Sequence, residues 1–352
     1  MKHLVVVLSI GVLACFVFLS LSYPKETSSP CDPKNPDACF YPIEDRYQVQ
    51  STLFWFQDSS RIGGPREIPI VIYEPDTLGK FPVIIASHGG AKGKRNALSS
   101  LPNWSRQLAA QGYVVVAIAH TPRNIPARKT LCDSLGMTTA ECKFFKHLNW
   151  DRPLDVGHVL DSLELWNTYA PWRDRMDLDH VGHVGHSAGA GCGMMLAGAK
   201  RMYHNQFLAF RESRIHAVGA FSPQGPGEEG FVDSSFLSIE TPILFGTGDG
   251  DNTSGSQALV RRQAFSKSAP SGDKYIHYIM DAKADHGTYS LNSDKCAKKK
   301  DPLQCQAYID WTFMSGLAFF DAYLKGDQDA MDWLTNKNIE TATADVVELR
   351  AK

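Results

Sequence analysis

Residues 179–191, with the sequence DHVGHVGHSAGAG, place three histidines at three-residue intervals directly before a serine. Imidazole suits zinc, and short spacings such as that of His180, His183 and His186 often supply ligands for this ion. However, β-branched valines alternate with glycines in this run, which predicts a strand. Side chains three residues apart on a strand point to opposite faces of the sheet, so neighbouring histidines cannot converge on one ion. We therefore expect no metal site here.

The same segment contains a Gly-x-Ser-x-Gly motif, in which Gly185 and Gly189 flank Ser187. A strand is predicted before the serine, and a helix rich in small residues is predicted after it, from Ala188 to Met202. In this order of elements the serine lies on a tight turn, where its hydroxyl is exposed and can act as a nucleophile. Glycines on either side keep Cβ atoms out of a crowded turn. Ser187 is therefore the candidate nucleophile, and the alternative is a glycine-rich turn with an idle serine.

A serine hydroxyl is a weak nucleophile until a neighbouring base removes its proton. In this architecture an acid and then a histidine follow the serine, each after a later strand of the sheet. Asp249 and Asp251 both follow the predicted strand 241–245, and the usual spacing from the preceding glycine favours Asp251. His286 ends the loop after 274–280, which we expect to be the last strand. We therefore predict Asp251 and His286 as the partners of the serine, with Asp249 as the alternative acid.

Such a nucleophile also needs backbone amides that stabilise a negatively charged oxygen, the oxyanion hole. The sequence Ser-His-Gly-Gly-Ala at 87–91 directly follows a predicted buried strand, where a loop amide should face the serine. We predict the N–H groups of Gly90 and Ala188 as the two donors. The alternative is that the two glycines simply form a flexible turn.

The rest of the chain predicts an α/β fold that can position these residues. An antiparallel hairpin is expected from 47–56 and 68–73, with a Gly-Gly-Pro turn between its strands. Uninterrupted apolar runs are typical of strands buried on both faces, and strands that alternate with helices predict a mostly parallel sheet between two helical layers. No linker divides the chain, so we expect one domain from 46 to 352. The expected strands are 81–86, 114–119, one at 181, 217–221, 243–246 and 274–280, and the expected helices are 104–111, 155–166, 188–202 and 307–324.

Charge and composition exclude some classes of partner. A formal net charge of −2 over 352 residues provides no basic surface for nucleic acid. No phosphate-binding loop or other cofactor motif is present in the sequence, so we expect no cofactor. The oligomeric state is not predicted.

The N-terminus has the pattern of an exported protein. Lys2 and His3 precede an apolar run from 4 to 21, and small residues follow it, which predicts a signal peptide over 1–22. An uncleaved membrane anchor or a lipoprotein signal are the alternatives. Residues 23–45 are rich in Pro, Asp and Ser and are expected to form an extended lead-in. The expected location is secreted or periplasmic, or membrane-anchored and facing outward.

Cysteine spacing agrees with export to an oxidising compartment. Six cysteines form three close pairs in polar, loop-like sequence, and we expect a disulfide within each pair. Cys192, in an apolar predicted helix, is expected to be buried as a small hydrophobic residue. The expected pairs are Cys31–Cys39, Cys132–Cys142 and Cys296–Cys305.

From about residue 66 to 325 the chain resembles the dienelactone-hydrolase-like and platelet-activating-factor-acetylhydrolase-like α/β-hydrolases, and more distantly the cutinase-like polyester hydrolases. The resemblance implies a serine hydrolase that cleaves carboxylic esters, small or lipid-like, without a cofactor, and it implies Ser187, Asp251 and His286 as the catalytic triad. Dienelactone hydrolases carry a cysteine where Ser187 stands, and 130–149 resembles an insertion. An amidase or peptidase and a non-catalytic binding protein are the competing classes. The stretches that carry the resemblance are FPVIIASHGG, LAAQGYVVVAIAH, RPLDVGHVLDSL, VGHVGHSAGA, FSPQGPG, TPILFGTGDGD and ADHG.

Overall fold

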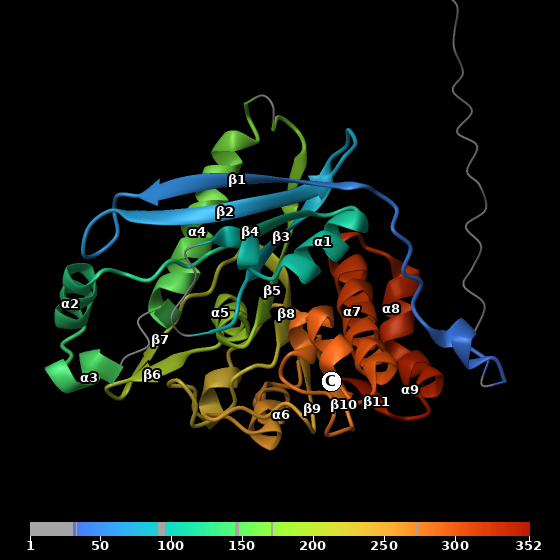
Figure 1. Cartoon of the computed structure of the whole chain (residues 1–352). Coiled ribbons are helices and arrows are strands. Elements are labelled where there is room, and N and C mark those ends of the chain that lie inside the picture. The colour runs from blue at the N-terminus through green and yellow to red at the C-terminus, as the bar shows by residue number, and fades with distance from the viewer. Residues whose placement is uncertain (1–30, 33, 91–95, 145–147, 170–171, 272) are drawn as a thin grey trace, which may run out of the picture.

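A computed structural model describes residues 31–32, 34–90, 96–144, 148–169, 172–271 and 273–352 (Figure 1). The predicted signal peptide therefore lies outside the described residues, as do residues 23–30 and 33 of the lead-in. The described part of the lead-in is not extended throughout, because Pro36–Cys39 forms a short 3-10 helix. Within the described part, the strands form a nine-stranded sheet in the order β1-β2-β4-β3-β5-β8-β9-β10-β11, and a separate two-stranded sheet pairs β6 with β7. The strands are β1 Val49–Asp58, β2 Arg66–Pro75, β3 Phe81–Ser87, β4 Val114–Ile118, β5 Met176–His186, β6 Arg201–Tyr203, β7 Gln206–Leu208, β8 Ile215–Phe221, β9 Ile243–Gly248, β10 Lys274–Ile279 and β11 Val347–Ala351.

The centre of the large sheet is parallel and its edges are antiparallel. The strands β4, β3, β5, β8, β9 and β10 pair in parallel, whereas the β1–β2 hairpin and β11 pair antiparallel with their neighbours. Because parallel strands end at the same edge of a sheet, the loops after β3, β5, β9 and β10 gather at one edge. This confirms the expectation of a large, mostly parallel sheet.

Helices cover both faces of this sheet, as its fully buried strands require (Figure 1). Side chains alternate between two cores: Ile84 packs with α1 and α7 on one face, and Ile85 packs with α4, α5 and α6 on the other. The helices are α1 Pro102–Ala110, α2 Ile125–Ser134, α3 Thr139–Phe144, α4 Leu148–Trp166, α5 Ala188–Leu196, α6 Ala258–Lys267, α7 Pro302–Leu324, α8 Gln328–Thr335 and α9 Asn338–Ala342.

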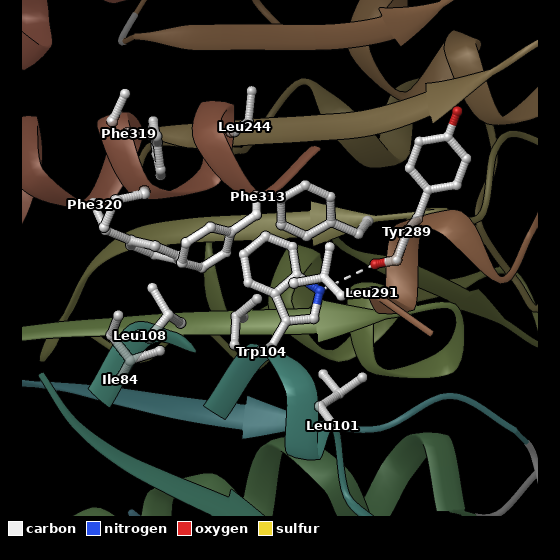
Figure 2. Packing of buried hydrophobic residues seen from close by; sticks show 14 of the residues in the cluster. Ile84, Leu101, Trp104, Leu108, Leu244, Tyr289, Leu291, Phe313, Phe319 and Phe320 are labelled. Carbon is white, nitrogen blue, oxygen red and sulfur yellow. Dashed lines mark hydrogen bonds between the residues drawn. The ribbon is translucent and has the colours of Figure 1, made fainter. Parts of the chain in front are cut away.

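One core also anchors the loop that follows β10. Trp104 of α1 packs against Phe313 of α7, and its indole Nε1 donates a hydrogen bond of 3.1 Å to the carbonyl of Tyr289 (Figure 2). Gly316 of α7 leaves space for the indole, because a Cβ there would lie 2.6 Å from a ring carbon. Tyr289 is three residues after His286, so this aromatic core fixes one end of the segment that carries the candidate base.

Several predicted elements differ from those observed. The helix predicted over 155–166 begins at Leu148, and the helix predicted over 307–324 begins at Pro302. The helix after the serine ends at Leu196 and not at Met202, because the backbone turns at Gly198 with φ +114 and then enters β6. The strand over 274–280 is not the last one, since β11 pairs with it at the edge of the sheet. The helix over 307–324 is likewise followed by α8 and α9.

The three expected disulfides are present. The bridges are Cys31–Cys39, Cys132–Cys142 and Cys296–Cys305, with Cα–Cα separations of 4.6, 5.7 and 5.4 Å. Cys192 is a buried free thiol, as predicted. Disulfides persist in oxidising compartments, so the protein belongs in one. Among the described helices, none has the length and apolar character needed to cross a membrane.

We expect reduction of the disulfides to lower the melting temperature without unfolding the central sheet. Each bridge closes a loop of about ten residues, which is worth about 2–3 kcal/mol of stability in the chain-entropy model. The test is thermal unfolding with and without reductant, and non-reducing peptide mass spectrometry as the control for the pairing. Six free thiols in protein from an oxidising compartment, or an unchanged melting temperature, would contradict this prediction.

Candidate active site

Ser187 lies on a strained turn between β5 and α5. It has φ 54 and ψ −118, a backbone conformation that residues other than glycine rarely adopt. The turn is too crowded for Cβ atoms at its neighbours: one at Gly185 would lie 2.2 Å from the carbonyl oxygen of Gly189, and one at Gly189 would lie 1.9 Å from that of Ser87. The glycines of the motif are therefore required by this geometry. Strain of this kind is typical of functional residues.

Ser187 is also the point at which this buried segment reaches the surface. From Val181 to Ala199 every residue is buried except Ser187, which is partly exposed. The amide of Ser187 donates to the carbonyl of Phe221 in β8 at 2.9 Å, which holds the turn to the neighbouring strand. The strand, turn and helix therefore present one hydroxyl to solvent.

His286 and Asp251 are in direct contact, although 34 residues separate them in the sequence. Nδ1 of His286 lies 2.7 Å from Oδ1 of Asp251. Asp251 is fully buried after β9, and the His286 side chain is 25% exposed after β10. A carboxylate in this position fixes the orientation of the ring and leaves Nε2 free to accept a proton.

The carboxylate of Asp251 is held in its charged form. Its Oδ2 accepts a hydrogen bond of 2.9 Å from the hydroxyl of Thr247, and Nε of Arg261 lies 3.3 Å from Oδ1. Burial alone would raise the pKa of Asp251, but the hydrogen bond from His286 and the charge of Arg261 outweigh burial and lower it. Asp251 is therefore ionised at neutral pH.

The alternative acid, Asp249, has a different partner. It is exposed, and its Oδ1 accepts a hydrogen bond of 2.5 Å from the hydroxyl of Tyr278. The contact with His286 belongs to Asp251, so the geometry favours Asp251 over Asp249 as the orienting carboxylate.

His186, the residue before the serine, ties the serine turn to the loop of His286. The two imidazole rings have centroids 4.5 Å apart, and Nε2 of His186 lies 2.9 Å from the carbonyl oxygen of His286. Burial, and then the charge of His286, lower the pKa of His186 to about 3, so its ring is neutral at pH 7. A neutral ring with a hydrogen on Nε2 donates to that carbonyl. His186 therefore links the candidate nucleophile and the candidate base through the backbone.

The loop after β3 packs directly against the serine. A Cβ at Gly89 would lie 3.2 Å from Cβ of Ser187 and 2.8 Å from Nδ1 of His186, so only glycine allows this approach. Gly90 is exposed and has φ +86, the left-handed conformation that glycine adopts without strain. Ala188 is the first residue of α5, and the first amides of a helix have no partner within it. Both predicted amide donors are thus on elements that meet at the serine.

The three histidines of the opening motif have three separate environments. His180 is exposed and pairs with Asp177, His183 is buried with Nε2 3.0 Å from the hydroxyl of Ser87, and His186 contacts His286. In the described part of the chain, no three His, Cys, Asp or Glu side chains are placed to hold a metal ion.

A second Ser-His-Asp chain of hydrogen bonds, which the sequence did not reveal, lies beneath the β3 loop. Oγ of Ser87 is 2.9 Å from Nε2 of His120, and Nδ1 of His120 is 2.9 Å from Oδ2 of Asp155. All three side chains are fully buried, so Ser87 is not accessible from solvent. Burial lowers the pKa of His120 to about 4, which keeps its ring neutral. This chain is therefore a buried structural support beneath the loop.

Arginines complete this support. Asp155 accepts two hydrogen bonds from Arg66, at 2.7 and 2.8 Å, and one of 2.9 Å from Arg61. Burial would raise the pKa of Asp155, but Arg66 and His120 outweigh it and hold the pKa far below the ordinary value. A signal for Asp155 was present in the Arg-Pro-Leu-Asp sequence at 152–155, which the resemblance included without assigning a role.

A comparison of the chain with models of protein families found no match. A search of curated proteins likewise found no protein that matches it.

Proposed function

We propose that this protein is a serine-dependent carboxylic ester hydrolase with an α/β-hydrolase fold. The observation that carries the proposal is the contact of His286 with the buried carboxylate of Asp251, beside the strained turn at Ser187. A partly exposed serine, a histidine with one free ring nitrogen and an ionised acid are the three groups that nucleophilic acyl transfer requires. The mostly parallel sheet, with these groups on loops at one edge, is compatible with that fold.

In the proposed mechanism Ser187 attacks the ester carbonyl while Nε2 of His286 accepts the hydroxyl proton. Asp251 holds Nδ1 of His286 and stabilises the imidazolium that forms. The amide N–H groups of Gly90 and Ala188 stabilise the oxyanion, and one such donor is worth about 3 kcal/mol in the transition state. His286 then gives its proton to the leaving alcohol. In the second half of the reaction water attacks the acyl-enzyme while His286 accepts a proton from it, and His286 then returns that proton to the oxygen of Ser187 as the carboxylic acid leaves.

The substrate class follows from the resemblance to dienelactone-hydrolase-like and platelet-activating-factor-acetylhydrolase-like enzymes, which is part of the proposal. We propose a small or lipid-like carboxylic ester, hydrolysed without a cofactor. We propose a site of action outside the cytosol, in the periplasm or the medium, and the three disulfides support such an oxidising compartment.

A fluorophosphonate probe is expected to label Ser187, because the probe reacts with serines that a neighbouring base activates. Intact mass spectrometry should show one adduct per chain, and peptide mapping should place it on Ser187. The variant Ser187→Ala should not be labelled. The buried Ser87, which has its own histidine partner, is the internal control. An adduct on Ser87, or labelling of the variant Ser187→Ala, would contradict the proposal.

Matched ester and amide substrates separate the proposed esterase from an amidase or peptidase. We expect turnover of p-nitrophenyl esters and little turnover of the corresponding p-nitroanilides. A series of acyl chain lengths then defines the acyl preference. Absence of turnover with both series, together with no labelling of Ser187, would favour a binding protein on the same fold.

A further inference from the structure

Arg152, in α4, is a fully buried arginine that binds the backbone of the loop after β3. Its Nη2 donates a hydrogen bond of 2.7 Å to the carbonyl of Gly90, and its Nη1 donates to the carbonyl of His88. The planar fork of the guanidinium therefore spans Gly89, the residue that packs against Ser187. One side chain contacts both ends of the short segment that carries a predicted oxyanion donor.

These two bonds and nearby negative groups, among them Asp155 and Glu229, compensate for burying this charge. Burial, the largest influence, lowers the pKa of Arg152 to about 10, so the group remains charged at neutral pH. No ion pair joins Arg152 to a carboxylate in the described part of the chain; Asp155, one turn along α4, pairs instead with Arg66 and Arg61. A buried charge without a direct ion pair is costly, and charge-assisted hydrogen bonds are among the strongest that can offset it. The carbonyls of the loop are therefore held firmly.

Arg152 holds the two peptide units that flank the one carrying the N–H of Gly90. A peptide unit is planar and trans, so the N–H of Gly90 points opposite to the carbonyl of Gly89, and that carbonyl lies 2.6 Å from Nδ1 of His88. The carbonyls of His88 and Gly90 point to Arg152, and a Cβ at Gly89, between them, would lie 3.2 Å from Cβ of Ser187. Gly90 has φ +86 and is exposed, so without the clamp its backbone could adopt other conformations. Arg152 thus restricts a glycine of the loop that has no side chain to hold it.

We propose that Arg152 is a positioning residue that preorganises the oxyanion loop by clamping the carbonyls of His88 and Gly90. The proposal rests on the proposed esterase function, because it assigns the loop amide of Gly90 to the transition state. Preorganised donors act without reorganisation during the reaction, and loss of one costs about 10²–10³ in kcat. Arg152 does not contact the reacting atoms, so its effect should appear in kcat and hardly in KM.

The test compares Arg152→Met and Arg152→Lys with the wild type in hydrolysis of p-nitrophenyl acetate. Methionine keeps much of the length but removes both donors, and we expect kcat to fall about 10²-fold with KM little changed. Lysine keeps the charge but lacks the planar fork of the guanidinium, so kcat of Arg152→Lys should lie between those of the wild type and Arg152→Met. The rate of fluorophosphonate labelling of Ser187 should fall in the same order, because the phosphonyl oxygen uses the same donors.

Arg201→Met is the matched control. Arg201 is 2% exposed, and it donates to the carbonyl of Glu229 at 3.0 Å and lies over the ring of Phe231. Both methionine variants should lose thermal stability, but only Arg152→Met should lose kcat by this factor. Equal losses of kcat in Arg152→Met and Arg201→Met would contradict the proposed role of Arg152. A wild-type kcat in both Arg152→Lys and Arg152→Met would contradict it as well. If Arg152→Met does not fold, the lysine variant decides. A wild-type protein that is neither labelled nor active would instead overturn the proposed function itself.

Discussion

Replacing His286 with alanine should lower kcat for a p-nitrophenyl ester by about 10⁶-fold, as expected when one member of a cooperating triad is removed. Without the imidazole, the hydroxyl of Ser187 has no base at the protein surface, and the leaving alcohol has no proton donor. The residues act as a unit, so the double variant with Ser187→Ala should be no slower than either single variant. Steady-state rates of the purified single and double variants test this non-additivity.

His180→Ala is the control for the His286 variant. His180 belongs to the three-histidine run, but it is exposed and pairs with Asp177 at the far end of β5. Its replacement should leave kcat unchanged, whereas a histidine-bound metal would require it. Comparable losses in His180→Ala and His286→Ala, or single losses that multiply in the double variant, would contradict the assignment of the base.

The turn that carries Ser187 was predictable because its signals are local. Alternating valines and glycines define a strand, and small residues permit the close packing that Gly185 and Gly189 show against backbone oxygens. The same holds for the disulfides, where each pair is separated by a short polar loop. Features that depend on neighbours in sequence can be inferred from sequence.

The support beneath the loop was not predictable, because it depends on which strands lie side by side. Ser87 ends β3, His120 lies just after β4 and Asp155 is in α4. They meet only because β3 and β4 are adjacent and α4 covers that face. The same reason explains why Arg152 was assigned no role, although it begins the Arg-Pro-Leu-Asp stretch at 152–155. A buried arginine looks like a surface arginine in a sequence until its helix is placed against the sheet.

The end of α5 and the edge strand β11 were missed for other reasons. Gly198 ends the helix, but its effect was hidden by the apolar and small residues around it. β11 is a short strand at the C-terminus whose pairing with β10 spans about 70 residues of chain, and no local pattern specifies such a partner. Neither difference moves a candidate site residue.

Asp251→Asn should lower kcat by about 10⁴-fold while the fold is retained. The buried carboxylate holds Nδ1 of His286 at 2.7 Å and so selects the ring tautomer whose Nε2 can accept a proton. An asparagine amide can offer its nitrogen to Nδ1 and favour the opposite tautomer, which leaves no acceptor toward Ser187. KM should change much less than kcat, because the aspartate does not contact the substrate. Rates with p-nitrophenyl esters and slower fluorophosphonate labelling of Ser187 test this.

Asp249→Asn is the matched control, since it makes the same chemical change two residues away in the same loop. Asp249 is exposed and accepts from Tyr278, and an asparagine oxygen can accept that bond too, so kcat should fall far less. Asp251→Asn leaves Arg261 without its charged partner, but this guanidinium still donates to the carbonyls of Ser222 and Pro223 at 2.9 Å. Thermal unfolding of both variants separates a loss of stability from a loss of catalysis. If Asp249→Asn were the more damaging change, the acid would be Asp249, and the buried Asp251 would be only a structural partner of His286.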